Sequence, residues 1–235
     1  MARLTDKKLR EDIIRICLTM NEVGINQGSS GNVSARLDDG ILITPSGMPY
    51  HLMKPTDIVK LYWDGSYEGE RLPSSEWRFH LDIMRERDDC NAVIHTHATA
   101  CTTLACLRMD IPAFHYMIAV AGGYDIRCSE YARFGTQQLS DHILKALEDR
   151  KACLMGNHGM LATGKSLDQT LGLAIEVENL ANVYWRTLQV TRPVILTNEQ
   201  MDEVIERIGA YGKQPEEIEE GQAPAFEAPP RRASA

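Results

Sequence analysis

The chain has 235 residues, 43% of them hydrophobic, and a formal net charge of −8. This length and composition predict one domain with a sizeable core, and the negative charge disfavours nucleic acid and acidic lipid surfaces as partners. No stretch approaches the ~18 continuous apolar residues of a membrane span, and the charged start MARLTDKKLREDII lacks the apolar region of a signal peptide. We therefore expect a cytoplasmic protein with no membrane partner, whose six cysteines are reduced because none forms a CxxC pair.

Hydrophobic periodicity predicts a first helix with Leu9, Ile13, Cys17 and Met20 on one face, ended by Gly24. Two strand-like runs around the turn sequence DDG then predict a hairpin at 32–44. The later elements, in chain order, are a strand at 58–62, a helix from about Ser74, a strand at 92–95, a helix at 99–107, a helix at 136–150, strands at 152–155 and 160–163, a long helix at 167–190 and a last helix at about 198–210.

Antiparallel hairpins combined with helices favour an α/β fold. We expect a three-layer α/β/α sandwich around a mixed, largely antiparallel central sheet. The segment 214–235 is rich in Pro, Ala and Glu and cannot bury enough apolar surface to offset the cost of ordering. We expect it to be a flexible tail.

Two histidines, His95 and His97, lie one residue apart in the apolar run AVIHTHATA. On a strand they point to the same side, so they can hold one metal ion. Two hydrogen-bonded polar residues at a strand end explain an isolated pair equally well, so further ligands are needed to decide.

His158 in GNHGM is a third candidate, because Gly156 and Gly159 allow tight backbone geometry there. Glu76, in the first turn of the helix after Pro73, is a fourth. Three imidazoles with one further position match a catalytic zinc site, whereas a structural site is closed by four ligands, usually including thiolates. The remaining candidates considered, His51, His115 and His142, have no evident ligand partner.

Three Gly/Ser segments suggest a phosphate site. Ser74 and Ser75 begin a helix, where backbone N–H groups attract anions, although an ordinary serine cap is the simpler explanation for them alone. The loops QGSSGNVS (27–34) and TPSG (44–47) can expose further N–H groups. The dinucleotide motif GxGxxG is absent, and we expect a small phosphorylated compound as the ligand, not a nucleotide.

The segments GSSGNVS, LITPSGMPY, LPSSEWRFH, AVIHTHA, IPAFHYMIAVAGG, YARFGT, NHG and AYG, in this order and spacing, resemble the class II L-fuculose-phosphate aldolase family. The resemblance covers about residues 5–213, and we expect one class II aldolase domain over residues 1–213. It implies reversible cleavage of a ketose 1-phosphate into dihydroxyacetone phosphate and a short aldehyde, in a C4 homotetramer with sites between subunits.

The resemblance also implies residue roles. His95, His97 and His158 would bind one Zn²⁺ per chain. Glu76 would occupy the remaining metal position in the empty site and would act as the acid/base once substrate has displaced it from the metal. Tyr116 would reach a neighbouring subunit's site as proton donor, and Tyr211 would act with Phe134 at the aldehyde end. The phosphate would be held by Ser29, Gly31, Asn32, Ser46, Gly47, Ser74 and Ser75.

Two positions depart from the family pattern: Asn157 stands where a second histidine is found, and Ile208 where an aromatic residue is found. The aldehyde specificity therefore stays open among L-fuculose, 5-deoxyribulose and 5-methylthioribulose 1-phosphates. Methylthioribulose-phosphate dehydratase is the alternative activity. Glu76 disfavours the related 4-epimerases, which carry Asp at this place, and the complete ligand set disfavours a non-enzymatic adducin-like module.

Overall fold

A computed structural model describes residues 6–218 and 221–226. Eight strands form one sheet in the order β4-β3-β2-β1-β5-β10-β9-β8, in which every neighbouring pair is antiparallel except β8 and β9. Its strands are β1 (Asn32–Leu37), β2 (Gly40–Ile43), β3 (Val59–Tyr62), β4 (Tyr67–Glu68), β5 (Ala92–Thr96), β8 (Cys128–Ser129), β9 (Ala152–Met155) and β10 (Gly159–Gly164). A separate pair consists of β6 (Ile111–Pro112) and β7 (Asp125–Ile126).

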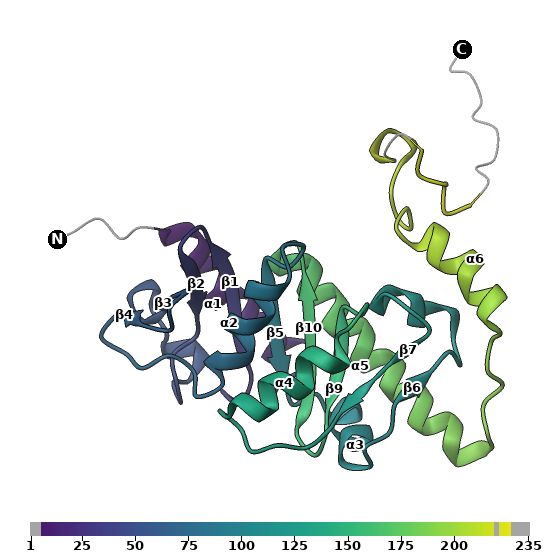
Figure 1. Ribbon diagram of the computed structural model, residues 1–235, viewed down its shortest axis with the longest axis horizontal. Coiled ribbons are helices and arrows are strands. Elements are labelled where there is room, and N and C mark those ends of the chain that lie inside the picture. Colours follow the sequence, from purple (N-terminus) through teal and green to yellow (C-terminus); the bar gives the residue numbers. More distant parts are fainter. Residues whose placement is uncertain (1–5, 219–220, 227–235) are drawn as a thin grey trace.

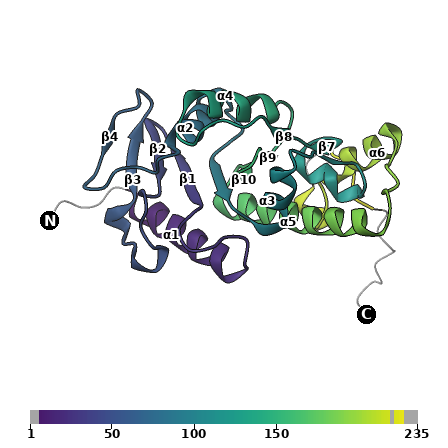
Figure 2. The ribbon, with the colours of Figure 1, turned by 90° about the horizontal axis from the view of Figure 1, so that it is seen from below.

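Helices cover both faces of the large sheet (Figures 1 and 2). The helices are α1 (Lys7–Glu22), α2 (Trp77–Glu86), α3 (Thr99–Cys106), α4 (Gln137–Ala146), α5 (Leu167–Val190) and α6 (Asn198–Ile208). Helices α1, α3 and α5 bury Ile94 and its neighbours on one face, while α2 and α4 bury Val93 and its neighbours on the other. Adjacent strand residues point to opposite faces, so each strand supplies both cores. The α/β class and the three predicted layers are confirmed.

Most predicted elements are present with small shifts at their ends. The hairpin turns at Asp38 and Asp39, and Gly24 adopts the positive φ of 81° expected just after a helix. The helix expected from Ser74 begins at Trp77, because Ser74 and Glu76 form the turn that precedes it. The helix expected to reach residue 150 ends at Ala146, and a tight turn with Asp149 at φ 56° follows.

Four strands were missed. β4, β6, β7 and β8 have only two residues each, too few for any periodic signal. Tyr116 begins the 3₁₀ helix η3 (Tyr116–Ala121), which was not predicted either, and its side chain is exposed.

Helix α6 packs against η3 at the end of the molecule farthest from β4 (Figure 1). Within the described residues, no helix is both long and apolar enough to cross a membrane. Part of the expected tail, 219–220 and 227–235, lies outside the described residues. Of the rest, Pro215–Glu217 form a 3₁₀ turn and Gln222 accepts a hydrogen bond from Lys213 (3.0 Å), so a flexible tail from residue 214 stays a prediction.

Candidate metal centre and active site

The histidine pair lies on β5, one of the central strands of the sheet. His95 lies opposite Asn32 on β1 and Leu161 on β10, and strand alternation places His97 on the same side as His95. His158 lies in the turn between β9 and β10. Glu76 immediately precedes α2, on the face of the sheet toward which His95 and His97 point. Residues far apart in the chain thus meet at one end of the central strands.

The three imidazoles face a common point. Their ligand atoms all lie within 4.8 Å of one another, and the ring centroids are 4.7–5.0 Å apart. The Glu76 carboxylate completes the group, with Oε2 3.2 Å from His95 Nε2 and Oε1 3.3 Å from His158 Nε2. This is the donor set of a catalytic zinc site.

Several of these buried atoms have no hydrogen-bond partner in the structure: His95 Nε2, His97 Nε2 and Glu76 Oε1. The carboxylate contacts are short, but the ring nitrogens are not aligned on the oxygens as hydrogen bonding requires. Leaving buried polar atoms unpaired costs about 1–3 kcal/mol each. A cation between them would satisfy all of them, so these residues fit a metal ion.

The protonation of the histidines suits metal binding. His95 Nδ1 donates to the Met160 carbonyl (2.9 Å), which leaves the lone pair on Nε2 facing the cluster. Burial, with His97 nearby, lowers the pKa of His95 to about 3. Burial, with His95 nearby, lowers the pKa of His158 to about 4. Both rings are therefore neutral at neutral pH, as a ligand must be.

Two glycines allow the backbone to approach the cluster. A Cβ on Gly159 would lie 2.4 Å from the Thr96 carbonyl oxygen and 3.1 Å from a carbon of the His97 ring. A Cβ on Gly31 would lie 2.5 Å from the His95 carbonyl oxygen. Because real Cβ atoms do not approach so closely, a side chain at either position would displace the strand that carries the histidines.

Two of the three predicted phosphate segments lie side by side. Pro45 and Pro73 form an isolated bridge, flanked by hydrogen bonds from Ser46 N to Leu72 O (3.1 Å) and from Ser74 N to Thr44 O (3.0 Å). Gly47 has a φ of 65°, which keeps the TPSG turn tight. The structure thus brings the 44–47 and 72–76 segments together directly ahead of Glu76.

Comparison with known proteins identifies the family. The model of the Class II Aldolase and Adducin N-terminal domain matches residues 11–185. The 5-methylthioribulose-1-phosphate/5-deoxyribulose-1-phosphate aldolase of Rhodospirillum rubrum is 52% identical over 204 residues, which cover 87% of this chain and 92% of that protein. The L-fuculose phosphate aldolase of Escherichia coli is 48% identical, over 89% of this chain and 98% of that protein.

The chain belongs to the class II aldolase family. It is therefore an aldolase, a carbon–carbon lyase. A solved structure named L-fuculose 1-phosphate aldolase superposes on this class II aldolase with a TM-score of 0.84 and 40% identity, covering 88% of this chain and 98% of that one. The family is metal-dependent, and the histidine and glutamate cluster is the place where this chain can hold a metal.

Asn32 was predicted to bind phosphate, and in this class II aldolase its side chain also holds Glu76. Asn32 Nδ2 donates to Glu76 Oε2 (2.9 Å), and Asn32 Oδ1 accepts from Nε2 of the fully buried His80. Sequence reasoning missed His80. The available signal was its spacing of four residues from Glu76 at the start of a predicted helix, which puts the two side chains on one face.

The three predicted aromatic residues have exposed side chains in the single chain. Tyr116 is 44% exposed and stacks on His115, and Tyr211, beyond the end of α6, is 61% exposed. Phe134 is also exposed. The next residue, Gly135, lies near the start of α2, since a Cβ there would come within 2.8 Å of the Ser75 carbonyl oxygen and the Gly135 carbonyl accepts from Arg78 Nε (3.2 Å). A single chain thus leaves all three rings open to solvent.

Asn157 has a positive φ of 56° in the turn that presents His158. Its Oδ1 accepts from Arg108 Nε (2.9 Å), and its backbone N–H donates to the Ala105 carbonyl at the end of α3 (2.9 Å). The Asn157 side chain therefore anchors the turn to α3.

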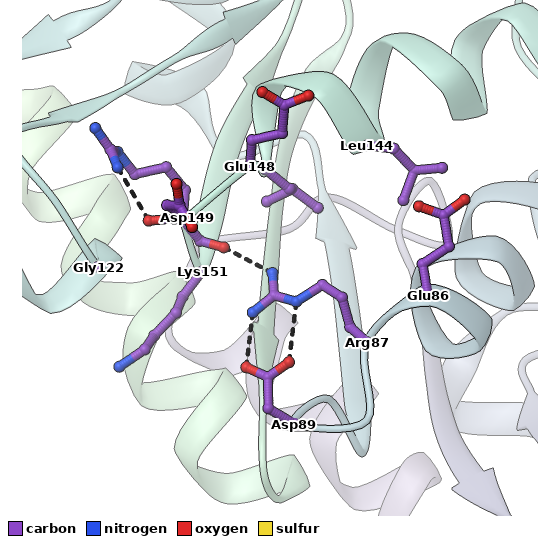
Figure 3. Close-up of a pocket in the computed structure, with 10 residues that line it drawn as sticks. Glu86, Arg87, Asp89, Gly122, Leu144, Glu148, Asp149 and Lys151 are labelled. Carbon is purple, nitrogen blue, oxygen red and sulfur yellow. Dashed lines mark hydrogen bonds and ion pairs between the residues drawn. The ribbon is translucent and has the colours of Figure 1, made fainter.

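A cavity of about 460 Å³ lies at the end of the strands opposite to the histidine cluster (Figure 3). Its lining residues precede β5 and β9, whereas the histidines lie at or beyond the far ends of those strands. Arg87 there makes two hydrogen bonds to Asp89 (2.8 and 3.1 Å) and one to the Arg150 carbonyl (2.6 Å). These charges pair with one another and with the backbone, and the histidine cluster remains the candidate active site.

Proposed function

We propose that this aldolase catalyses the zinc-dependent, reversible cleavage of a ketose 1-phosphate to dihydroxyacetone phosphate and a short aldehyde. The observation that carries the proposal is the convergence of three imidazoles and one carboxylate, in which His95 Nε2, His97 Nε2 and Glu76 Oε1 are buried without hydrogen-bond partners. The nearby phosphate loops and the substrates named for the relatives support the substrate class.

His95, His97 and His158 would hold one Zn²⁺ per chain, with Glu76 at the remaining position in the absence of substrate. Nitrogen ligands with one exchangeable position are characteristic of catalytic zinc. When bound, the ion supplies a Lewis acid that stabilises the negative charge on the ketone oxygen by several kcal/mol. No Schiff-base lysine is then required.

The chain's own residues move the protons and hold the substrate. In the condensation direction, Glu76 removes a proton from the carbon next to the ketone of dihydroxyacetone phosphate, and cleavage returns it. The phosphate is held by Ser29, Gly31, Asn32, Ser46, Gly47, Ser74 and Ser75. The serine hydroxyls and loop N–H groups can donate to its oxygens.

We further propose a C4 homotetramer in which Tyr116 of the partner subunit donates a proton to the aldehyde-derived oxygen, and Tyr211 and Phe134 line that end of the substrate. The exposure of all three aromatic rings in the single chain supports this arrangement.

Mixing Tyr116→Phe chains with Glu76→Gln chains is expected to restore part of the activity that each variant lacks alone. A hybrid contains sites that combine an intact Glu76 with an intact Tyr116 from the partner subunit. Activity is measured before and after subunit exchange, and hybrids are verified by mass spectrometry. Verified hybrids with no recovery would count against shared sites.

The physiological substrate is proposed to be L-fuculose, 5-deoxyribulose or 5-methylthioribulose 1-phosphate. A coupled assay for dihydroxyacetone phosphate across these three compounds tests the function, and we expect release from at least one of them. A diketone product that retains every carbon would instead identify a dehydratase. Release from none of the three would refute the proposed substrate class.

We also propose that the protein works in the cytoplasm. The six cysteines are unpaired, which supports a reducing compartment.

A further inference from the structure

A chain of hydrogen bonds runs from the interior of the protein to Glu76. Ser34 Oγ lies 2.7 Å from His80 Nδ1, His80 Nε2 contacts Asn32 Oδ1, and Asn32 Nδ2 lies 2.9 Å from Glu76 Oε2. All four residues are buried, and Ser34 and His80 are fully so. The proposed function leaves Ser34 and His80 without a role.

The donor and the acceptor of each hydrogen bond in this chain follow from the Glu76 carboxylate, which can only accept. Glu76 accepts, so the Asn32 NH₂ group faces it and the Asn32 carbonyl faces His80. His80 must then donate from Nε2. Burial lowers the pKa of His80 well below its usual value, so the ring is neutral and Nδ1 accepts from the Ser34 hydroxyl.

The His80 ring is also held by packing. It stacks on Phe79 at a centroid distance of 4.7 Å with an interplanar angle of 26°. Phe79 in turn makes an edge contact with the ring of His95 (5.8 Å). The ring therefore cannot turn over without disturbing the residues next to the histidine cluster.

We propose that His80, oriented by Ser34, is a positioning residue that keeps the N–H groups of Asn32 turned toward the active site. A flipped Asn32 would present its carbonyl oxygen to Glu76, and two hydrogen-bond acceptors, one partly and one fully negative, would face each other. The same N–H groups would face the substrate phosphate once Glu76 has moved. The expected effect on activity rests on the proposed function, in which Glu76 and Asn32 act on the substrate. The orientation of Asn32 by His80 does not depend on that function.

A matched pair of variants separates positioning from packing. In His80→Gln the amide lies near the position of Nε2 and can still donate to Asn32, whereas in His80→Asn it lies near Nδ1 and cannot. We expect His80→Asn to lose about tenfold to a hundredfold in kcat/KM, the value of the hydrogen bond from Asn32 to the charged Glu76 that a misoriented Asn32 would lose. His80→Gln should recover most of that loss at equal metal content and comparable melting temperature. Equal losses in two folded variants would overturn the proposal.

Ser34→Ala provides a second test if the His80 variants do not fold. Without the Ser34 hydroxyl, the His80 tautomer that is protonated at Nδ1 also becomes populated, and this tautomer cannot donate to Asn32. We therefore expect kcat/KM to fall by about tenfold. Ser140→Ala is the matched control, since Ser140 is equally buried and its hydroxyl donates to Asp82 (2.7 Å), away from the histidine cluster. Ser34→Ala with the activity of Ser140→Ala would overturn the proposal.

The tautomer can be read directly, without any assay of activity. Histidine-labelled ¹⁵N spectra of the intact protein, with the His80 signals assigned from His80→Gln, should show a neutral ring protonated at Nε2. Ser34→Ala should shift signal toward the Nδ1-protonated form. A charged ring, or Nδ1 protonation in the unmodified protein, would refute the inference. Because this readout needs no substrate, it remains decisive even if the proposed reaction is wrong.

Discussion

Glu76→Gln is expected to lower kcat by about a hundredfold to ten-thousandfold, the usual contribution of a general acid or base. Glutamine has nearly the same shape and can still accept the hydrogen bond from Asn32, but it cannot take up a proton. Binding of substrate should therefore change much less than turnover. Steady-state kinetics at equal metal content measure both.

Glu203→Gln is the matched control for this experiment. Glu203 is exposed on α6, and the same substitution there should leave kcat unchanged. A Glu76→Gln enzyme with near-normal kcat would remove Glu76 from the proposed proton transfer. The metal ligands would be unaffected by that result.

His97→Ala is expected to remove most of the bound metal and, with it, the activity. Losing a group that only orients a ligand weakens metal binding by about 10–100-fold, so losing a ligand should weaken it by more than that. His97 is preferable to His95 for this test, since His97 is only partly buried and its removal leaves a smaller internal cavity. Metal analysis of folded protein gives the result.

The unmodified protein should contain one zinc ion per chain in the same analysis. His51→Ala is the control, because His51 is exposed in a 3₁₀ turn and belongs to no metal cluster among the described residues. Fully folded unmodified protein with no metal, or His97→Ala with its metal retained, would contradict the proposed site.

The parts of this fold that sequence predicts well are those specified by neighbouring residues. The long helix at 167–190 has the same ends in sequence and structure, because Ser166 caps its first turn and apolar residues repeat along one face. Alternation along β5 likewise placed His95 and His97 on one side. Both signals are contained in a short window of sequence.

What sequence could not predict depends on residues that meet only in the folded chain. The bond between His80 and Asn32 joins residues 48 positions apart, and no local pattern marks it. Asn32 faces His95 only because β1 and β5 pair in one particular register. The rings of Tyr116 and Tyr211 are exposed in the single chain, and the surroundings that we propose for them leave no signal in a short window of sequence.

The position of α6 has a consequence for how such an enzyme diverges. The histidines are fixed in the middle of the sheet, between β1 and β10, whereas Ile208 and Tyr211 lie at the end of a helix that packs mainly on η3. Mutations near Ile208 therefore disturb few of the contacts that stabilise the sheet. With Tyr211 at the aldehyde end, as we propose, a lineage could exchange one aldehyde for another by small changes at this periphery while it inherits its reaction chemistry intact.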